Sequence, residues 1–306
     1  MSSAARGSRL ATVLLVLVTA VWGSTFFLIR DLVQTVPAID FLAVRFTIAA
    51  LVMGAVFHRQ VRSLTRRELR IGVVLGGLYG LAQILQTIGL RTTDASVSGF
   101  ITGIYVVLTP ILAALLLRDR VGRSAWLAVV LATLGLALLS LKGGLTLESG
   151  EVVTLLAAVV YALHIVGLGR WSTADAAVGL ATVQAATIAV VCLAGAAPGG
   201  VILPHDGGQW AATLYMAVVA GAGALWAQTW AQAHLTATRA AIVMTLEPVF
   251  AAFFAVLFGG ESLTVRMLLG GGLVVAAMYL VELGGQHPPD ASAQDEPPAE
   301  ALHHEV

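Results

Sequence analysis

The sequence predicts an all-α integral membrane protein whose ten transmembrane helices form two inverted five-helix repeats. Composition is the first observation behind this fold class, because 58% of the 306 residues are hydrophobic and 11% are charged. An ordinary soluble domain carries about 25% charged residues, so packing a soluble core does not explain the excess of apolar residues. The second observation is a series of long apolar runs, and the third is an internal repeat of some of them.

Ten apolar runs are each close to the roughly 20 residues that a helix needs to cross a bilayer. They cover approximately Leu10 to Ile29, Ile39 to Phe57, Leu69 to Leu90, Ser96 to Leu117, Ser124 to Leu141, Val152 to Leu168, Ala177 to Ala197, Gln209 to Ala231, Arg239 to Phe258 and Val265 to Leu283. The first run is too long for the apolar region of a typical signal peptide, so we expect it to be retained as a helix.

Basic residues concentrate in alternate loops, and this asymmetry predicts the orientation. One set of loops holds Arg6, Arg9, Arg59, Arg62, Arg66, Arg67, Arg70, Arg118, Arg120, Arg123, Arg170 and Arg239, whereas the other set holds Arg30, Arg91, Lys142 and Arg266. Loops rich in Arg and Lys mark the cytoplasmic side of a membrane. We therefore expect a multi-pass protein of the cell inner membrane with both termini in the cytoplasm.

The internal repeat relates the two halves of the chain. A shift of 142 residues places Ala237 on Ala95 and Gln228 on Gln86, without gaps. The first half is predicted to cover residues 1–145 and the second half residues 146–285, with five runs in each. Because five is odd, the second half must enter the membrane from the opposite face, which is the inverted arrangement of many transporters. Residues 286–306 are polar, acidic and rich in Pro, which predicts a disordered cytoplasmic tail.

These features resemble the drug/metabolite transporter superfamily with two EamA domains, over nearly all of the chain. The motifs that carry the resemblance are Trp22-Gly23-Ser24, Pro37 with Arg45, Tyr105 through Pro110, Leu246-Glu247-Pro248 and Gly260 through Thr264. The resemblance implies ten helices, cytoplasmic termini and transport of small metabolites, often outward and often driven by ion gradients. The chain departs from the pattern at Asp119, where a Glu is commoner, and at Pro110, which lies one turn beyond the position that matches Pro248. The helix kinks at Pro110 and Pro248 therefore need not be symmetric.

Glu247 is the leading candidate for a functional residue, because it lies about 12 Å into its run at the rise of a helix. An ionised side chain at that depth is costly in lipid, so Glu247 should face the interior as a proton or cation site or as a hydrogen-bond acceptor. The structural alternative is a protonated or paired Glu that caps groups freed by Pro248, which cannot donate to the Met244 carbonyl. Tyr105, the repeat partner of Glu247, could bind a ligand or simply pack.

Arg45 and His164 are the other ionisable candidates for coupling or gating. Arg45 could hold a substrate carboxylate or phosphate, but we favour a structural role in which it pairs with Asp40 or with backbone carbonyls freed at kinks. His164 could shuttle protons near neutral pH, or it could be hydrogen-bonded across helices.

Several further side chains complete the predicted substrate site in a central cavity. The predicted substrate-binding set is Trp22, Thr25, Gln83, Gln86, Thr102, Tyr105, His164, Trp226, Gln228 and Glu247. Amides at membrane depth could bind a ligand or tie helices together, and a membrane Thr often bonds its own helix.

Missing motifs exclude other classes of function. The sequence has no GxxxxGK[ST] phosphate loop, no HExxH and no GxSxG, so we expect no cofactor, no metal and no enzyme activity. A net charge of zero gives no reason to expect a nucleic-acid partner.

The leading prediction is a secondary active transporter, and specifically an exporter, that works by alternating access. Its expected substrates are small metabolites, amino acids or drug-like amphipathic compounds, with a proton or another cation as co-substrate. The alternative is a facilitative uniporter or channel, and a membrane enzyme or receptor is least favoured. Stripes of small residues such as Gly72, Gly76 and Gly80 are compatible with a homodimer, but an internal helix contact explains them better.

Overall fold

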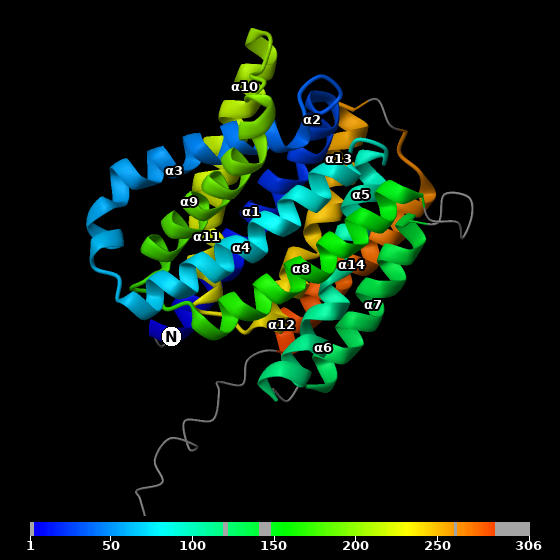
Figure 1. Cartoon of the computed structure of the whole chain (residues 1–306). Coiled ribbons are helices and arrows are strands. Elements are labelled where there is room, and N and C mark those ends of the chain that lie inside the picture. The colour runs from blue at the N-terminus through cyan, green and yellow to red at the C-terminus, as the bar shows by residue number, and fades with distance from the viewer. Residues whose placement is uncertain (1–2, 119–121, 141–147, 260–261, 285–306) are drawn as a thin grey trace, which may run out of the picture.

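The computed structural model describes residues 3–118, 122–140, 148–259 and 262–284, and these residues form a bundle of helices (Figure 1). The helices are α1 (Ser3–Gly23), α2 (Thr25–Leu32), α3 (Ala38–Arg62), α4 (Arg66–Gly89), α5 (Ala95–Thr102), α6 (Tyr105–Leu117), α7 (Arg123–Ser140), α8 (Ser149–Trp171), α9 (Ala177–Ala196), η1 (Ala197–Gly199), α10 (Gly207–Ala217), η2 (Val218–Gly223), α11 (Ala224–Gln232), α12 (Ala237–Met244), α13 (Leu246–Leu257) and α14 (Val265–Gly284). The described residues include no strand, and the predicted all-α class is confirmed. The predicted tail, and the Gly260-Glu261 and Asp119-Arg120 positions of the family resemblance, lie outside the described residues.

Eight helical stretches of the described chain are long and apolar enough to cross a membrane. They are Gly7–Leu32, Ala38–Arg62, Arg66–Gly89, Ala95–Leu117, Ser149–Trp171, Ala177–Gly199, Gly207–Gln232 and Ala237–Leu257. The fifth and tenth predicted runs differ, because their apolar stretches are shorter, at Trp126–Gly135 in α7 and at Leu268–Ala277 in α14. These two helices pack against each other at one edge of the bundle (Figure 1).

Two of the long stretches are broken at matching positions in the repeat. Helix α5 ends at Thr102 and α12 ends at Met244, which the shift of 142 residues places on each other. At both breaks the chain tightens into i→i+3 hydrogen bonds, from Ile104 N to the Ile101 carbonyl and from Thr245 N to the Ile242 carbonyl. Pro110 instead lies inside α6. The breaks are therefore symmetric although the prolines are not.

A third break is a π-helical turn, η2, between α10 and α11. A π-helical turn shifts the hydrogen-bond register and marks functional positions in many proteins. Here two backbone carbonyls at the turn accept hydrogen bonds from other helices: Met216 from Arg45 of α3 (3.0 Å) and Ala220 from Trp22 of α1 (2.9 Å). The turn thus binds the second half of the chain to the first.

The halves contact each other in reciprocal pairs of helices. Helix α4 packs on α8 and α1 packs on α11, while α3 packs on α9 and α7 on α14. Each of these pairs maps onto itself or onto another pair when the halves are exchanged. The small residues of α4 make such an approach possible, because a Cβ on Gly76 would lie 2.8 Å from the Gln184 Cα of α9. The Gly72, Gly76 and Gly80 stripe therefore packs internally, as predicted.

Candidate functional site

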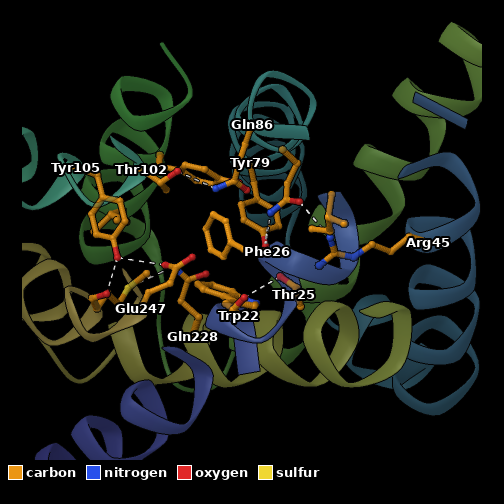
Figure 2. Close-up of a pocket in the computed structure, with 15 residues that line it drawn as sticks. Trp22, Thr25, Phe26, Arg45, Tyr79, Gln86, Thr102, Tyr105, Gln228 and Glu247 are labelled. Atoms are coloured by element: carbon orange, nitrogen blue, oxygen red, sulfur yellow. Dashed lines mark hydrogen bonds between the residues drawn. The ribbon is translucent and has the colours of Figure 1, made fainter. Parts of the chain in front are cut away.

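A cavity lies between the two halves, where the broken stretches meet (Figure 2). It is lined by Trp22, Thr25, Phe26, Ile29, Arg45, Tyr79, Gln83, Gln86, Thr102, Tyr105, Tyr161, Ile165, Gln228, Met244 and Glu247. Its interior offers about 30 Å³ to the centres of water-sized molecules, which is room for about two or three waters. This conformation is therefore contracted around the site, and a larger molecule needs the cavity to expand.

Arg45 forms one end of the cavity (Figure 2). It is 2% exposed, and no carboxylate of the described residues forms an ion pair with it. Its Nε donates to the Met216 carbonyl and its Nη1 donates to the Gln83 amide oxygen at 3.3 Å. The prediction that Arg45 bonds a backbone carbonyl freed at a kink agrees with this geometry. The alternative partner, Asp40, instead accepts a hydrogen bond from the Ile202 backbone at 3.0 Å.

Glu247 and Tyr105 lie toward the other end, with the Phe26 ring between them and Arg45 in Figure 2. The Tyr105 hydroxyl donates to the Met244 carbonyl at 2.7 Å and lies 3.3 Å from Glu247 Oε2. Pro248 has no N–H, so the Met244 carbonyl lacks its usual helical donor and Tyr105 replaces it. Because the single hydroxyl proton favours the shorter contact, the Glu247 carboxyl is only weakly bonded. It is the acidic group that faces the cavity.

The two repeat-related amides of the cavity differ in how their hydrogen bonds are used. The Gln86 amide donates to Thr102 at 2.9 Å and accepts from the Tyr161 hydroxyl at 3.0 Å. The Gln228 nitrogen reaches only the Met244 sulfur at 3.8 Å, and its buried oxygen has no hydrogen-bond partner among the described residues. A buried acceptor without a donor is costly. Gln228 therefore offers a free acceptor at the lining, whereas Gln86 is already satisfied within the protein.

Two predicted site residues do not line the cavity, and these expectations are corrected. His164 is fully buried behind Tyr79, whose ring stacks on the imidazole at 5.0 Å, and its Nε2 lies 2.8 Å from the Gln184 amide oxygen. This contact is the alternative in which His164 is hydrogen-bonded across helices. Trp226 is 36% exposed. It precedes Gln228 by two residues, which is about 200° around a helix, so it turns away when Gln228 faces the cavity.

The other predicted residues lie at the lining, but their hydrogen bonds differ in kind. Thr25 donates to the carbonyl of Trp22 in its own chain turn at 2.7 Å, which is the structural alternative for a membrane Thr. Gln83 links Arg45 to the Tyr79 hydroxyl, which accepts from the Gln83 amide at 3.1 Å. Thr102 ends α5 at the break and accepts from Gln86. Pro110 is buried in α6, outside the lining.

The structure adds lining residues that the sequence reasoning missed, namely Phe26, Ile29, Tyr79, Tyr161, Ile165 and Met244. Two of them carried a usable signal. Tyr161 matches Trp22 in the repeat, and both line the cavity. Tyr79 precedes Gln83 by four residues, so both lie on one face of α4. The apolar residues carry no distinguishing pattern in a chain this hydrophobic.

The ionisable groups of the cavity do not form a metal centre. Within the described ranges, no group of three or more His, Cys, Asp and Glu side chains is close enough to hold a metal ion. What the lining offers is a guanidinium at one end, a carboxyl and a free amide oxygen at the other, and aromatic rings between them. Such a lining can recognise a small amphipathic molecule by charge and by stacking.

Comparison with known proteins agrees with this architecture. The EamA-like transporter family matches residues 9–141 and 148–283. An uncharacterized transporter from Archaeoglobus fulgidus is 29% identical over 269 residues, which cover 88% of this chain and 84% of the relative. A solved crystal structure of a protein that shares 18% identity superposes with a TM-score of 0.70, over 89% of this chain and 96% of the other, and supports the fold. The chain is thus a multi-pass membrane protein with two EamA domains, and it belongs to the EamA-like transporter family of the drug/metabolite transporter superfamily.

Proposed function

We propose that this transporter is a secondary active exporter of small zwitterionic or amphipathic metabolites, such as amino acids, and that it works by alternating access. The observation that carries the proposal is the cavity between the halves, which holds Arg45 and Glu247 without pairing them. Buried charged groups are costly and are kept where they bind or move a charge. A substrate that carries both charges would compensate both ends at once.

The proposed topology is ten spans in two inverted repeats, covering residues 1–145 and 146–285. The reciprocal helix pairs support a two-fold relation between the halves. The contact between Tyr105 and Glu247 supports it too, because these repeat partners meet each other as residues near a two-fold axis do. With both termini in the cytoplasm of an inner-membrane protein, this arrangement allows one central site to open to either side.

The proposed binding mode follows from which polar groups remain free. A substrate carboxylate binds at Arg45, which still has guanidinium N–H groups beyond those bonded to Met216 and Gln83. A substrate ammonium binds at Glu247 and the free Gln228 oxygen. The aromatic rings of the lining hold the apolar part of the molecule by stacking and cation–π contacts.

The proposed coupling uses Glu247. A carboxyl this buried carries either a proton or the substrate ammonium, so proton entry on one side displaces substrate and drives exchange. Arg45 holds α3 to the π-helical turn and so gates the cavity, while Pro248 and the matched breaks supply the kinks around which the halves move. His164 enters only indirectly, through its stacking on Tyr79.

The test is transport by the purified protein in proteoliposomes, with a panel of amino acids and other small metabolites, with and without an imposed proton gradient. We expect one class of zwitterion to accumulate only under the gradient. Flux that merely equilibrates would favour the facilitative uniporter instead. Gradient-driven transport of substrates that lack an ammonium group would overturn the assignment of Glu247 and Gln228.

A further inference from the structure

A second hollow lies on the outside of the bundle, where α4 begins beside the end of α8. It is a groove that offers about 520 Å³ to the centres of water-sized molecules. Its lining consists of Arg66, Arg67, Arg70, Ile71, Val74 and Trp171. None of these residues lines the central cavity. The groove therefore has no part in holding the transported molecule.

The basic side chains of the groove are not neutralised by the protein. No acidic side chain of the described ranges forms an ion pair with Arg66, Arg67 or Arg70. The nearest acidic residue in the sequence, Glu68, accepts hydrogen bonds from the backbone N–H and the hydroxyl of Thr65, both at 2.7 Å. Glu68 is thus occupied as part of the capping box that begins α4. Three free guanidinium groups line one groove.

The rest of the groove is apolar and runs into a membrane-spanning stretch. Trp171 lies against the crevice between α8 and α4, because a Cβ built on Gly167 would touch both its ring and the Leu75 side chain. Val74 is 52% exposed, and it continues the groove along the span Arg66–Gly89. A Trp with Arg residues at the end of a span is typical of the membrane–water interface. The groove therefore extends from the headgroup level toward the hydrocarbon.

We propose that this groove is a binding site for an anionic phospholipid. The phosphate and the acidic headgroup lie among the three guanidinium groups, which suit phosphate geometry, and an acyl chain lies along Ile71, Val74 and Trp171. The combination selects this occupant, because a free phosphate would leave the apolar wall unused and a zwitterionic lipid would leave the net positive charge uncompensated.

The test measures lipid binding by the full chain reconstituted in phosphatidylcholine nanodiscs. Spin-labelled phosphatidylglycerol reports binding, and labelled phosphatidylcholine serves as the reference lipid. The double variant Arg67→Gln/Arg70→Gln removes two charges from the groove. The matched control Arg59→Gln/Arg62→Gln removes two charges from the neighbouring end of α3, outside the groove lining. Each interfacial Arg strengthens the binding of an anionic lipid about fivefold.

We expect wild type to prefer phosphatidylglycerol, the groove variant to lose about 10- to 30-fold in affinity, and the control to change by less than a third of that factor. Equal losses in both double variants would overturn the site in favour of general surface charge. Competition by glycerol 3-phosphate as effective as that by the whole lipid would assign the groove to a free anion instead.

Trp171→Leu tests the apolar wall and leaves every charge in place, so it serves even where the Arg variants fold poorly. It should weaken phosphatidylglycerol more than glycerol 3-phosphate. Unchanged lipid binding in this variant would contradict the proposal that the wall holds the acyl chain.

Discussion

The contact between Tyr105 and the Met244 carbonyl tests how the second-half break is stabilised. The change Tyr105→Phe removes one hydroxyl, and with it the 2.7 Å hydrogen bond that satisfies this buried carbonyl. An unsatisfied buried acceptor costs about 1 to 3 kcal/mol in soluble proteins, whereas hydrogen bonds between membrane helices average about 0.6 kcal/mol and reach about 1.7. We therefore expect the free energy of unfolding to fall by about 1 to 1.5 kcal/mol.

The second change, Pro248→Ala, makes the prediction specific. Alanine at this position restores an N–H four residues after Met244, so the carbonyl regains a helical donor. In the Pro248→Ala background, Tyr105→Phe should cost less than half of what it costs in wild type. The coupling free energy of this double-mutant cycle should be about 0.5 to 1 kcal/mol. Unfolding of the reconstituted protein by titration with a denaturing detergent measures all four variants.

A matched control separates this mechanism from general loss of a buried hydroxyl. Tyr161→Phe removes a hydroxyl that donates to the Gln86 side chain at 3.0 Å, not to a freed backbone carbonyl. Its cost should be the same with Pro248 and with Ala at that position. If Tyr105→Phe were equally costly in both backgrounds, the reasoning that Tyr105 replaces the missing proline N–H would be refuted.

Three further predictions concern the ends of the cavity. Glu247→Gln should abolish proton-driven transport while substrate binding stays measurable, and unchanged pH-dependent flux would remove Glu247 from the coupling role. Arg45→Ala should lower the folded yield more than it changes substrate selectivity, because the Met216 carbonyl at the π-helical turn loses its donor; normal yield with altered selectivity would contradict this. Gln228→Leu should raise the KM for substrate with little loss of stability, whereas Gln86→Leu should destabilise the protein by about 1 kcal/mol because it breaks two internal hydrogen bonds. The opposite pattern in KM and melting temperature would show that the free Gln228 oxygen is not a substrate acceptor.

Much of the site could be predicted from the sequence because a polar residue in an apolar run has few places to go. The repeat placed Glu247 on Tyr105, and the two side chains meet in the structure. The same logic correctly kept Gln86, Gln228 and Arg45 inside the bundle. In each case the high cost of exposing a polar group to lipid fixed the direction of the side chain.

The errors came where the position along a run was known but the rotation of the helix was not used. Trp226 and Gln228 differ by two residues, so they cannot face the same cavity on one regular helix. His164 matches Thr25 in the repeat, but Tyr79 of α4 occupies the space in front of it. A repeat match predicts depth in the membrane, whereas the residues of neighbouring helices decide which side chain reaches the cavity. That information is not local to the sequence.

The contracted cavity and the matched breaks bear on the same step of transport. A space that holds only a few waters must widen before a metabolite enters, and rigid spanning helices bend most readily where their backbone hydrogen bonds are already incomplete. The chain has such points beside the cavity, after Thr102, after Met244 and at the π-helical turn. Each is held by a side chain from another helix, since Tyr105 bonds Met244 and Arg45 bonds Met216. Because these side chains also line the cavity, a substrate that draws Arg45 or Glu247 away from its present contacts would loosen the turn or the break next to it. Binding and opening are thereby linked through the same few hydrogen bonds.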